Sequence, residues 1–214
     1  AVDFSVLQNQ PKVPAEFVWP ENDVTPSQGD LDVPIIDLRS FFHGDSATKD
    51  RTATAVRAAC ETHGTFLVIN HGIDSDLTES AHEMAKWFFG LPMDVKLKAE
   101  RSSGTIPGYS VAHAERFSAN LVWNETFSFD FSEGPTPVVE EFVRSKLGQD
   151  FEEMGKLYQK YCESMNRLSL DLMELMGTSL GLKDEKYYRK FFEDGCAIFR
   201  CNYYPPCKQP DRAL

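Results

Sequence analysis

One run of residues constrains the fold of this 214-residue chain more than any other part of it. From Gln149 to Leu180, apolar side chains recur at every third or fourth position, which is the spacing of a helix that buries one face. Gly181 follows directly and is a suitable C-terminal stop. We interpret the stripe as a core-facing surface rather than a cofactor site, so the helix is the expected scaffold for other elements. The apolar positions are Met154, Leu157, Tyr158, Tyr161, Met165, Leu168, Leu172, Leu175 and Met176.

Shorter elements are expected before this helix. The apolar runs VPIIDL (33–38) and TFLVIN (65–70) are strand candidates, and the helical pattern of residues 48–63 separates them. A second helix follows, with Asp74 or Ser75 as its N-cap. Strand, helix, strand and helix therefore open the molecule, after a proline-containing arm (1–32) that we expect to be extended on the surface.

Two later segments read as strands with a polar face. In WNETFSFDF (123–131) aromatic residues alternate with polar ones that include Thr126 and Ser128. Either the polar set is solvated or it faces a ligand. In the final strand, CAIFRCNYY, Arg200, Asn202 and Tyr204 share one face, and the two following prolines end the strand. A phenol and an amide at a strand end suit a carboxylate, and a plain buried polar pair is the alternative.

Charge and cysteine content exclude several classes of function. The formal net charge is −11 and no Lys/Arg cluster interrupts it, which argues against nucleic acid and anionic membranes as partners. No apolar run reaches the roughly 18 residues of a membrane span, and no secretory signal is visible. The 5 cysteines form no CxxC pair, which favours reduced thiols over a disulfide framework or a zinc site. We therefore expect a soluble, cytoplasmic protein.

The motif NYYPPC (202–207) resembles the signature of plant 2-oxoglutarate- and Fe(II)-dependent dioxygenases. VPIIDL and GTFLVINHGI agree with the same family, in the same order. The passages GYSVAHAERFSANLVWNETFSF and GQDFEEMGKLYQKYCESMNRLSLDLMELM are most similar to the gibberellin 20-oxidase branch. The resemblance covers nearly the whole chain.

This resemblance implies a mixed α/β (α+β) fold with a double-stranded β-helix, or jelly-roll, core. Residues 33–135 would form the N-terminal helical and strand region. Residues 136–214 would hold the long helix and the first strands of the jelly roll, which would be incomplete at the C-terminus. In the family a His-x-Asp and a distant His hold the iron, and they follow NYYPPC. We therefore expect the chain to be truncated before its iron ligands and inactive alone.

Two other places match His-x-acid on paper, His43-Gly44-Asp45 and His113-Ala114-Glu115. A facial iron triad needs two histidines and a carboxylate on converging strands. The first match lies in a polar loop, and no histidine follows the second. No metal ligand and no catalytic residue is assigned within the chain.

The resemblance also implies specific roles for the two polar strand faces. Asn202 and Tyr204 would bind the cosubstrate 2-oxoglutarate, and Thr126 and Ser128 would face the substrate, whereas Arg200 receives no role. The family's Leu-Pro-Trp-Lys-Glu-Thr appears here as LVWNET, with Asn124 in place of Lys, which puts the substrate preference in question.

The implied activity is 2-oxoglutarate-dependent oxidation of a small diterpenoid acid, at carbon 20 of a gibberellin precursor, in gibberellin biosynthesis. Fe(II), 2-oxoglutarate and ascorbate would be required. Two alternatives remain open from the residues: another branch of the family, of the flavonoid or ethylene-forming type, and a non-catalytic binding or decoy protein made from a truncated gene.

Overall fold

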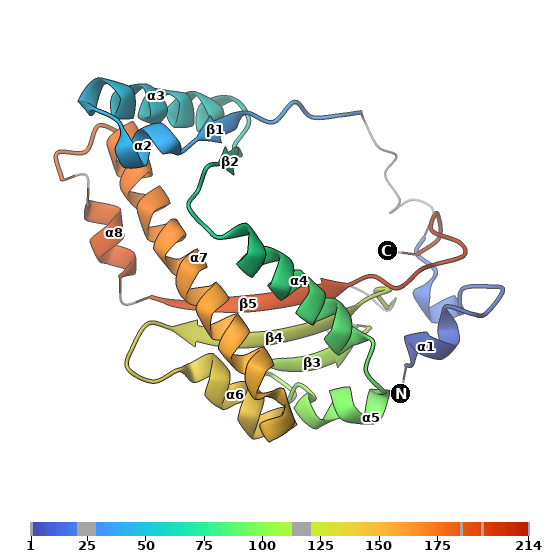
Figure 1. The fold of residues 1–214 in the computed structure, drawn as a ribbon. Coiled ribbons are helices and arrows are strands. Elements are labelled where there is room, and N and C mark those ends of the chain that lie inside the picture. Colours follow the sequence, from blue (N-terminus) through green and yellow to red (C-terminus); the bar gives the residue numbers. More distant parts are fainter. Residues whose placement is uncertain (1, 21–28, 113–120, 185, 194, 214) are drawn as a thin grey trace.

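The structure is a computed structural model and describes residues 2–20, 29–112, 121–184, 186–193 and 195–213. Helices and strands alternate along much of the chain, which confirms the mixed α/β (α+β) class (Figure 1). In chain order the elements are α1 (Phe4–Leu7), the 3-10 turn η1 (Ala15–Phe17), β1 (Ile35–Asp37), α2 (Arg39–His43), α3 (Ser46–Thr62), β2 (Leu67–Ile69), α4 (Ser75–Phe89), α5 (Met93–Lys96), η3 (Leu97–Ala99), β3 (Gly108–Val111), β4 (Glu125–Ser132), α6 (Val138–Leu147), η4 (Gln149–Phe151), α7 (Glu152–Ser179), α8 (Tyr187–Phe192) and β5 (Cys196–Tyr203).

An antiparallel sheet in the order β3-β4-β5 positions the polar strand faces. Helices α4, α6 and α7 lie along one side of this sheet (Figure 1). The aromatic residues of β4 point into that layer, where Phe127 and Phe129 are fully buried. Phe199 of β5 stacks on Phe129 with ring centroids 4.8 Å apart. The strands predicted at 123–131 and at CAIFRCNYY are both confirmed, with the aromatic side toward the helices.

Helix α7 is the scaffold that the apolar stripe predicts, and it serves two cores. Its first half contributes Met154 and Tyr158 to the core beneath the sheet. Its second half contributes Leu168 and Leu175 to a separate core. Met165 lies between these two groups and is 40% exposed, because neither core reaches it. One helix therefore joins two packing units (Figure 1).

The second core lies around the parallel strand pair β1 and β2, in register Ile35↔Leu67. Both strands, helix α3 between them and helix α4 after them occur close to where the sequence predicts them. Helix α2 was not predicted, and His43, which was expected in a polar loop, is its last residue. Asp74 caps α4 by accepting from the backbone N–H of Asp76 at 2.9 Å. Within the described ranges, no helix combines the length and apolar character that a bilayer crossing requires.

The N-terminal arm differs from the extended surface segment that we expected. Residues 4–7 form a turn of helix, with Asp3 as its N-cap. Phe4 and Phe17 are fully buried and form a third core with Trp123. The prediction rested on proline content and on the lack of periodicity. Neither feature indicates that two isolated aromatic residues pack against Trp123, which is distant in the sequence.

Strand β3 was also not expected, because the Gly, Pro and Ser content of 101–110 is typical of a loop. Its four residues pair with β4, with Tyr109 opposite Phe127. Pairing with a long strand, rather than local propensity, makes this segment a strand. Helix α6 was likewise not predicted, although it packs closely on α7 through Gly155, where an added Cβ would lie 3.0 Å from the Cα of Glu140.

Candidate functional site

The sheet brings together residues that the sequence placed on separate strands. Thr126 of β4 is the register partner of Asn202 on β5, and Ser128 is the partner of Arg200. The Arg200 Nε donates a hydrogen bond to the Ser128 Oγ at 3.0 Å. Because directly opposed residues in an antiparallel pair lie on the same face, these four side chains form one polar surface, on the side away from the helices.

The two β4 residues on this surface are not solvated. Thr126 and Ser128 are 2% and 1% exposed, and β4 is the central strand of the sheet. Of the alternatives left open by the alternation, solvation is therefore wrong for Thr126 and Ser128, whereas Asp130 of the same polar set is exposed. The Ser128 hydroxyl accepts from Arg200 and retains its own proton to donate. Arg200, for which the sequence supplied no role, thus orients Ser128.

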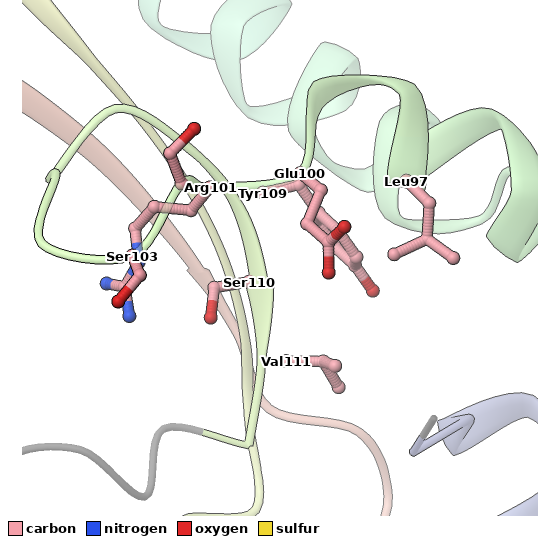
Figure 2. A pocket seen from close by; sticks show the side chains of 8 residues that line it. Leu97, Glu100, Arg101, Ser103, Tyr109, Ser110 and Val111 are labelled. Atoms are coloured by element: carbon pink, nitrogen blue, oxygen red, sulfur yellow. The ribbon is translucent and has the colours of Figure 1, made fainter.

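The polar surface continues across β3 into a hollow at the edge of the sheet. Ser110 is the register partner of Thr126. Together with Arg101 and Ser103 it lines a hollow of about 230 Å³. Figure 2 shows Arg101 and Ser103 on the same side of β3 as Ser110, whereas Tyr109 lies on the opposite side of the strand. Glu100 lines the same hollow, so hydroxyls together with one positive and one negative group suit a hydroxylated ligand.

Tyr204 lies immediately after the end of β5 and is 64% exposed. The residues on either side of Tyr204 are fixed by packing. The ring of Tyr203 stacks on Phe89 with centroids 5.4 Å apart, and Pro205 is buried. Asn202 is exposed as well, one residue inside the strand. An exposed phenol between two anchored residues can bind a ligand without first ordering the backbone that carries it.

A buried ionic cluster beside the polar surface was not anticipated. Lys96 Nζ donates to Glu125 Oε2 at 2.6 Å and to the Phe89 carbonyl at 3.0 Å. The Tyr109 hydroxyl donates to the same Glu125 oxygen at 2.6 Å. Burial and this carboxylate raise the pKa of Tyr109 far above its usual range. The sequence held a signal: Glu125 falls on the aromatic side of the alternation, where a carboxylate needs a buried partner.

The first His-x-acid match has a structural role. Asp45, of the first His-x-acid match, is the N-cap of α3 and accepts from the Thr48 backbone N–H at 2.9 Å and from the Thr48 hydroxyl. These hydrogen bonds, the hydroxyl one foremost, lower the pKa of Asp45. His113 and Glu115 lie outside the described residues. In the part of the chain that the structure describes, no three His, Cys, Asp or Glu side chains gather as a metal would require. The described residues do not fit an iron site.

The fold belongs to a known class of protein. The family described as "non-haem dioxygenase in morphine synthesis N-terminal" matches residues 33–146, and the chain is a member of that family. Its similarity extends to named enzymes. It is 58% identical over 213 residues to gibberellin 20 oxidase 5 of Arabidopsis thaliana, covering 100% of this chain and 55% of that protein. It is 48% identical over 210 residues to gibberellin 20 oxidase 2 of Oryza sativa subsp. indica, covering 97% of this chain and 54% of that protein.

Solved structures agree with this relationship. A crystal structure of JOX2 in complex with 2OG, Fe and JA matches with a TM-score of 0.78 at 27% identity, covering 100% of this chain and 60% of that one. The dioxygenase for auxin oxidation in rice matches with a TM-score of 0.61 at 24% identity, covering 81% of this chain and 52% of that one, and shares the fold. The chain spans about half the length of the curated relatives it matches.

Proposed function

We propose that this chain is part of a 2-oxoglutarate- and Fe(II)-dependent dioxygenase that oxidises a gibberellin precursor at carbon 20. The observation that carries the proposal is the 58% identity to gibberellin 20 oxidase 5, which extends over 100% of the chain. Each round of the reaction consumes one O₂ and one 2-oxoglutarate, releases CO₂ and succinate, and oxidises the substrate by two electrons. Iron and 2-oxoglutarate supply this oxidising chemistry when bound.

The polar strand surface supports a division of roles within the chain. Tyr204 and Asn202 are exposed donors at the end of β5, suited to the carboxylate of 2-oxoglutarate. Thr126 and Ser128 are buried on the adjoining strand and are the proposed substrate-facing residues. Because Thr126 and Asn202 are register partners, the two proposed binding regions are contiguous. Iron would be held by residues outside those that the structure describes.

The test is an activity assay on the full-length protein. It would be supplied with Fe(II), ascorbate, 2-oxoglutarate and a gibberellin precursor that retains carbon 20, and succinate and oxidised product would be quantified by mass spectrometry. We expect product formation to require both iron and 2-oxoglutarate. Turnover of a flavanone or of an ethylene precursor in place of the gibberellin precursor would move the protein to another branch. The absence of any turnover, with bound ligand, would favour a binding or decoy role.

Tyr204→Phe tests the cosubstrate role directly. Loss of one hydrogen bond to a charged carboxylate should weaken 2-oxoglutarate binding by about 1.5–3 kcal/mol, measured by calorimetry on the full-length protein. Tyr203→Phe is the matched control, because that ring stacks on Phe89 at the helix-covered side. An unchanged affinity in Tyr204→Phe, or an equal loss in both variants, would show that the Tyr204 hydroxyl does not bind the cosubstrate.

The remaining expectations belong to the same proposal. A carboxylated diterpenoid is the proposed partner, and the cytoplasm is the proposed compartment. The acidic net charge of −11 supports the absence of nucleic-acid binding. Ascorbate is proposed as an activator that keeps the iron reduced.

A further inference from the structure

We propose that Trp123 is a positioning residue of the 2-oxoglutarate site, and that the N-terminal arm belongs to that site through it. The indole holds the backbone carbonyl of Pro205 and so orients Tyr204, which immediately precedes this proline. The inference rests on the proposed function for its ligand, but the geometry of the tie is independent of that function.

The tie itself is a buried hydrogen bond between segments far apart in the sequence. Trp123 Nε1 donates to the Pro205 carbonyl oxygen at 2.9 Å. Trp123 is 5% exposed, and Pro205 is also buried. An indole N–H can only donate a hydrogen bond, and leaving it unpaired in an apolar surrounding is unfavourable. Because proline fixes its own φ angle, holding its carbonyl restricts the direction in which the preceding residue leaves the strand.

The arm fixes the indole in turn. The ring of Phe4 meets Trp123 edge to face with centroids 4.8 Å apart, and Phe17 does the same at 5.1 Å. Both phenylalanines are essentially unexposed. Aromatic pairs of this geometry contribute beyond their buried area and favour one ring orientation. The indole therefore cannot turn its N–H away from Pro205 without displacing the arm.

Further hydrogen bonds connect the arm to both segments that this tie joins. The Leu121 backbone N–H donates to the Glu16 carbonyl at 2.7 Å, two residues before Trp123 in the segment that leads into β4. The Trp19 backbone N–H donates to the Arg212 carbonyl at 3.0 Å, beyond the NYYPPC motif. The Val13 N–H donates to Gln209 Oε1 at 3.0 Å. Figure 1 shows the N-terminal segment and the C-terminal segment side by side.

Tyr204 is consequently anchored on both sides while remaining exposed itself. Tyr203 is held by its stacking on Phe89 at 5.4 Å, and Pro205 is held by Trp123. A binding group on a fixed backbone avoids the entropy of ordering when its ligand arrives. Loss of the Trp123 tie should therefore appear in the affinity for 2-oxoglutarate.

The decisive variant is Trp123→Phe in the full-length protein, which keeps an aromatic ring between the two phenylalanines and removes the N–H. We expect the dissociation constant for 2-oxoglutarate to rise about threefold to tenfold. Amide hydrogen exchange of the ligand-free protein should become faster at Tyr204 and Cys207, with peptides of α3 unchanged. Trp87→Phe is the matched control, because Trp87 is half-exposed on α4 and packs on Phe151.

The outcomes separate this inference from the proposed function. Faster exchange at the motif together with weaker 2-oxoglutarate binding, both absent in Trp87→Phe, supports the inference. A wild type that binds 2-oxoglutarate, beside a Trp123→Phe variant with unchanged affinity and exchange, overturns the inference alone. A wild type that fails to bind 2-oxoglutarate overturns the proposed function and the ligand assigned here together. Faster exchange throughout the protein would indicate general destabilisation and overturn the specific role of Trp123.

Discussion

At the scale of single residues, the main structural feature outside the two proposed binding regions is a buried ion pair. Lys96 and Glu125 are 4% and 2% exposed. A buried pair of this kind is weak support for stability as such, but removing one partner leaves the other charge buried and uncompensated. Tyr109 and the Phe89 carbonyl complete the cluster, which joins α5, β3, the start of β4 and the end of α4.

Lys96→Met should therefore reduce the free energy of unfolding by about 3–5 kcal/mol, measured by chemical denaturation of the full-length protein. Adding Glu125→Gln should restore much of this loss, since the neutral amide still accepts from Tyr109. Lys86→Met is the control, because the Lys86–Glu83 pair is exposed, and it should change stability by less than about 1 kcal/mol. Equal effects of the two lysine substitutions would contradict this account.

At the scale of elements, β3 depends on the close approach of two backbone segments. The Arg101 backbone N–H donates to the Tyr109 carbonyl at 2.8 Å, where the chain passes beside the strand. Gly108 has a φ of +125°, and a Cβ there would lie 2.6 Å from the Arg101 Cα and 2.8 Å from the Ala99 carbonyl oxygen. Backbone atoms on both sides leave no flexible group to move, so only glycine suits the position.

Gly108→Ala should destabilise the full-length protein by more than about 3 kcal/mol, as strain from positive φ is added to overpacking. Gly104→Ala isolates the contribution of the strain from positive φ. Gly104 has a φ of +78° in the same loop, with nothing within 4 Å of an added Cβ, and should lose about 1–2 kcal/mol. Denaturation curves for the two variants measure the difference, and similar losses would mean that the close contact relaxes at little cost.

At the scale of the whole molecule, these 214 residues expose more surface than a compact protein of their mass. The accessible area is 13373 Å², against about 10,000 Å² for a folded monomer of 24.2 kDa. Part of the excess is apolar, on β1 and β2 at Ile35, Leu67 and Ile69. Strand β5 is an edge of its sheet, and open edges of this kind invite association.

We therefore expect residues 1–214, when purified alone, to be marginally stable and prone to associate. Far-UV circular dichroism should show helix, because α7 and α3 can form locally, while a dye for apolar surface should bind. Sedimentation measures the association. A clean monomer with a sharp cooperative melt and no dye binding would contradict this expectation and strengthen the reading of the chain as an independent binding module.

The sequence by itself determined the elements whose cause is local. The stripe on α7, the Asp74 cap, the alternation in β4 and the end of β5 before two prolines all follow from periodicity and backbone chemistry within a few residues. Strand β5 ends at Tyr203, one residue earlier than predicted. The family followed from motifs such as NYYPPC. The placement of the polar residues on one face of each strand also followed from the two-residue period.

Only the tertiary structure decided which of these faces meet. The pairing of Thr126 with Asn202, the bond from Arg200 to Ser128 and the tie from Trp123 to Pro205 join positions about seventy to eighty residues apart. Strand register and side-chain contact at that separation depend on how whole elements pack, and no local pattern encodes them. Long-range packing also explains why a segment with loop-like composition forms β3, and why Phe4 and Phe17 are buried although a surface arm was predicted. Residue type determines the chemistry of each side chain, whereas long-range packing determines which side chains lie together.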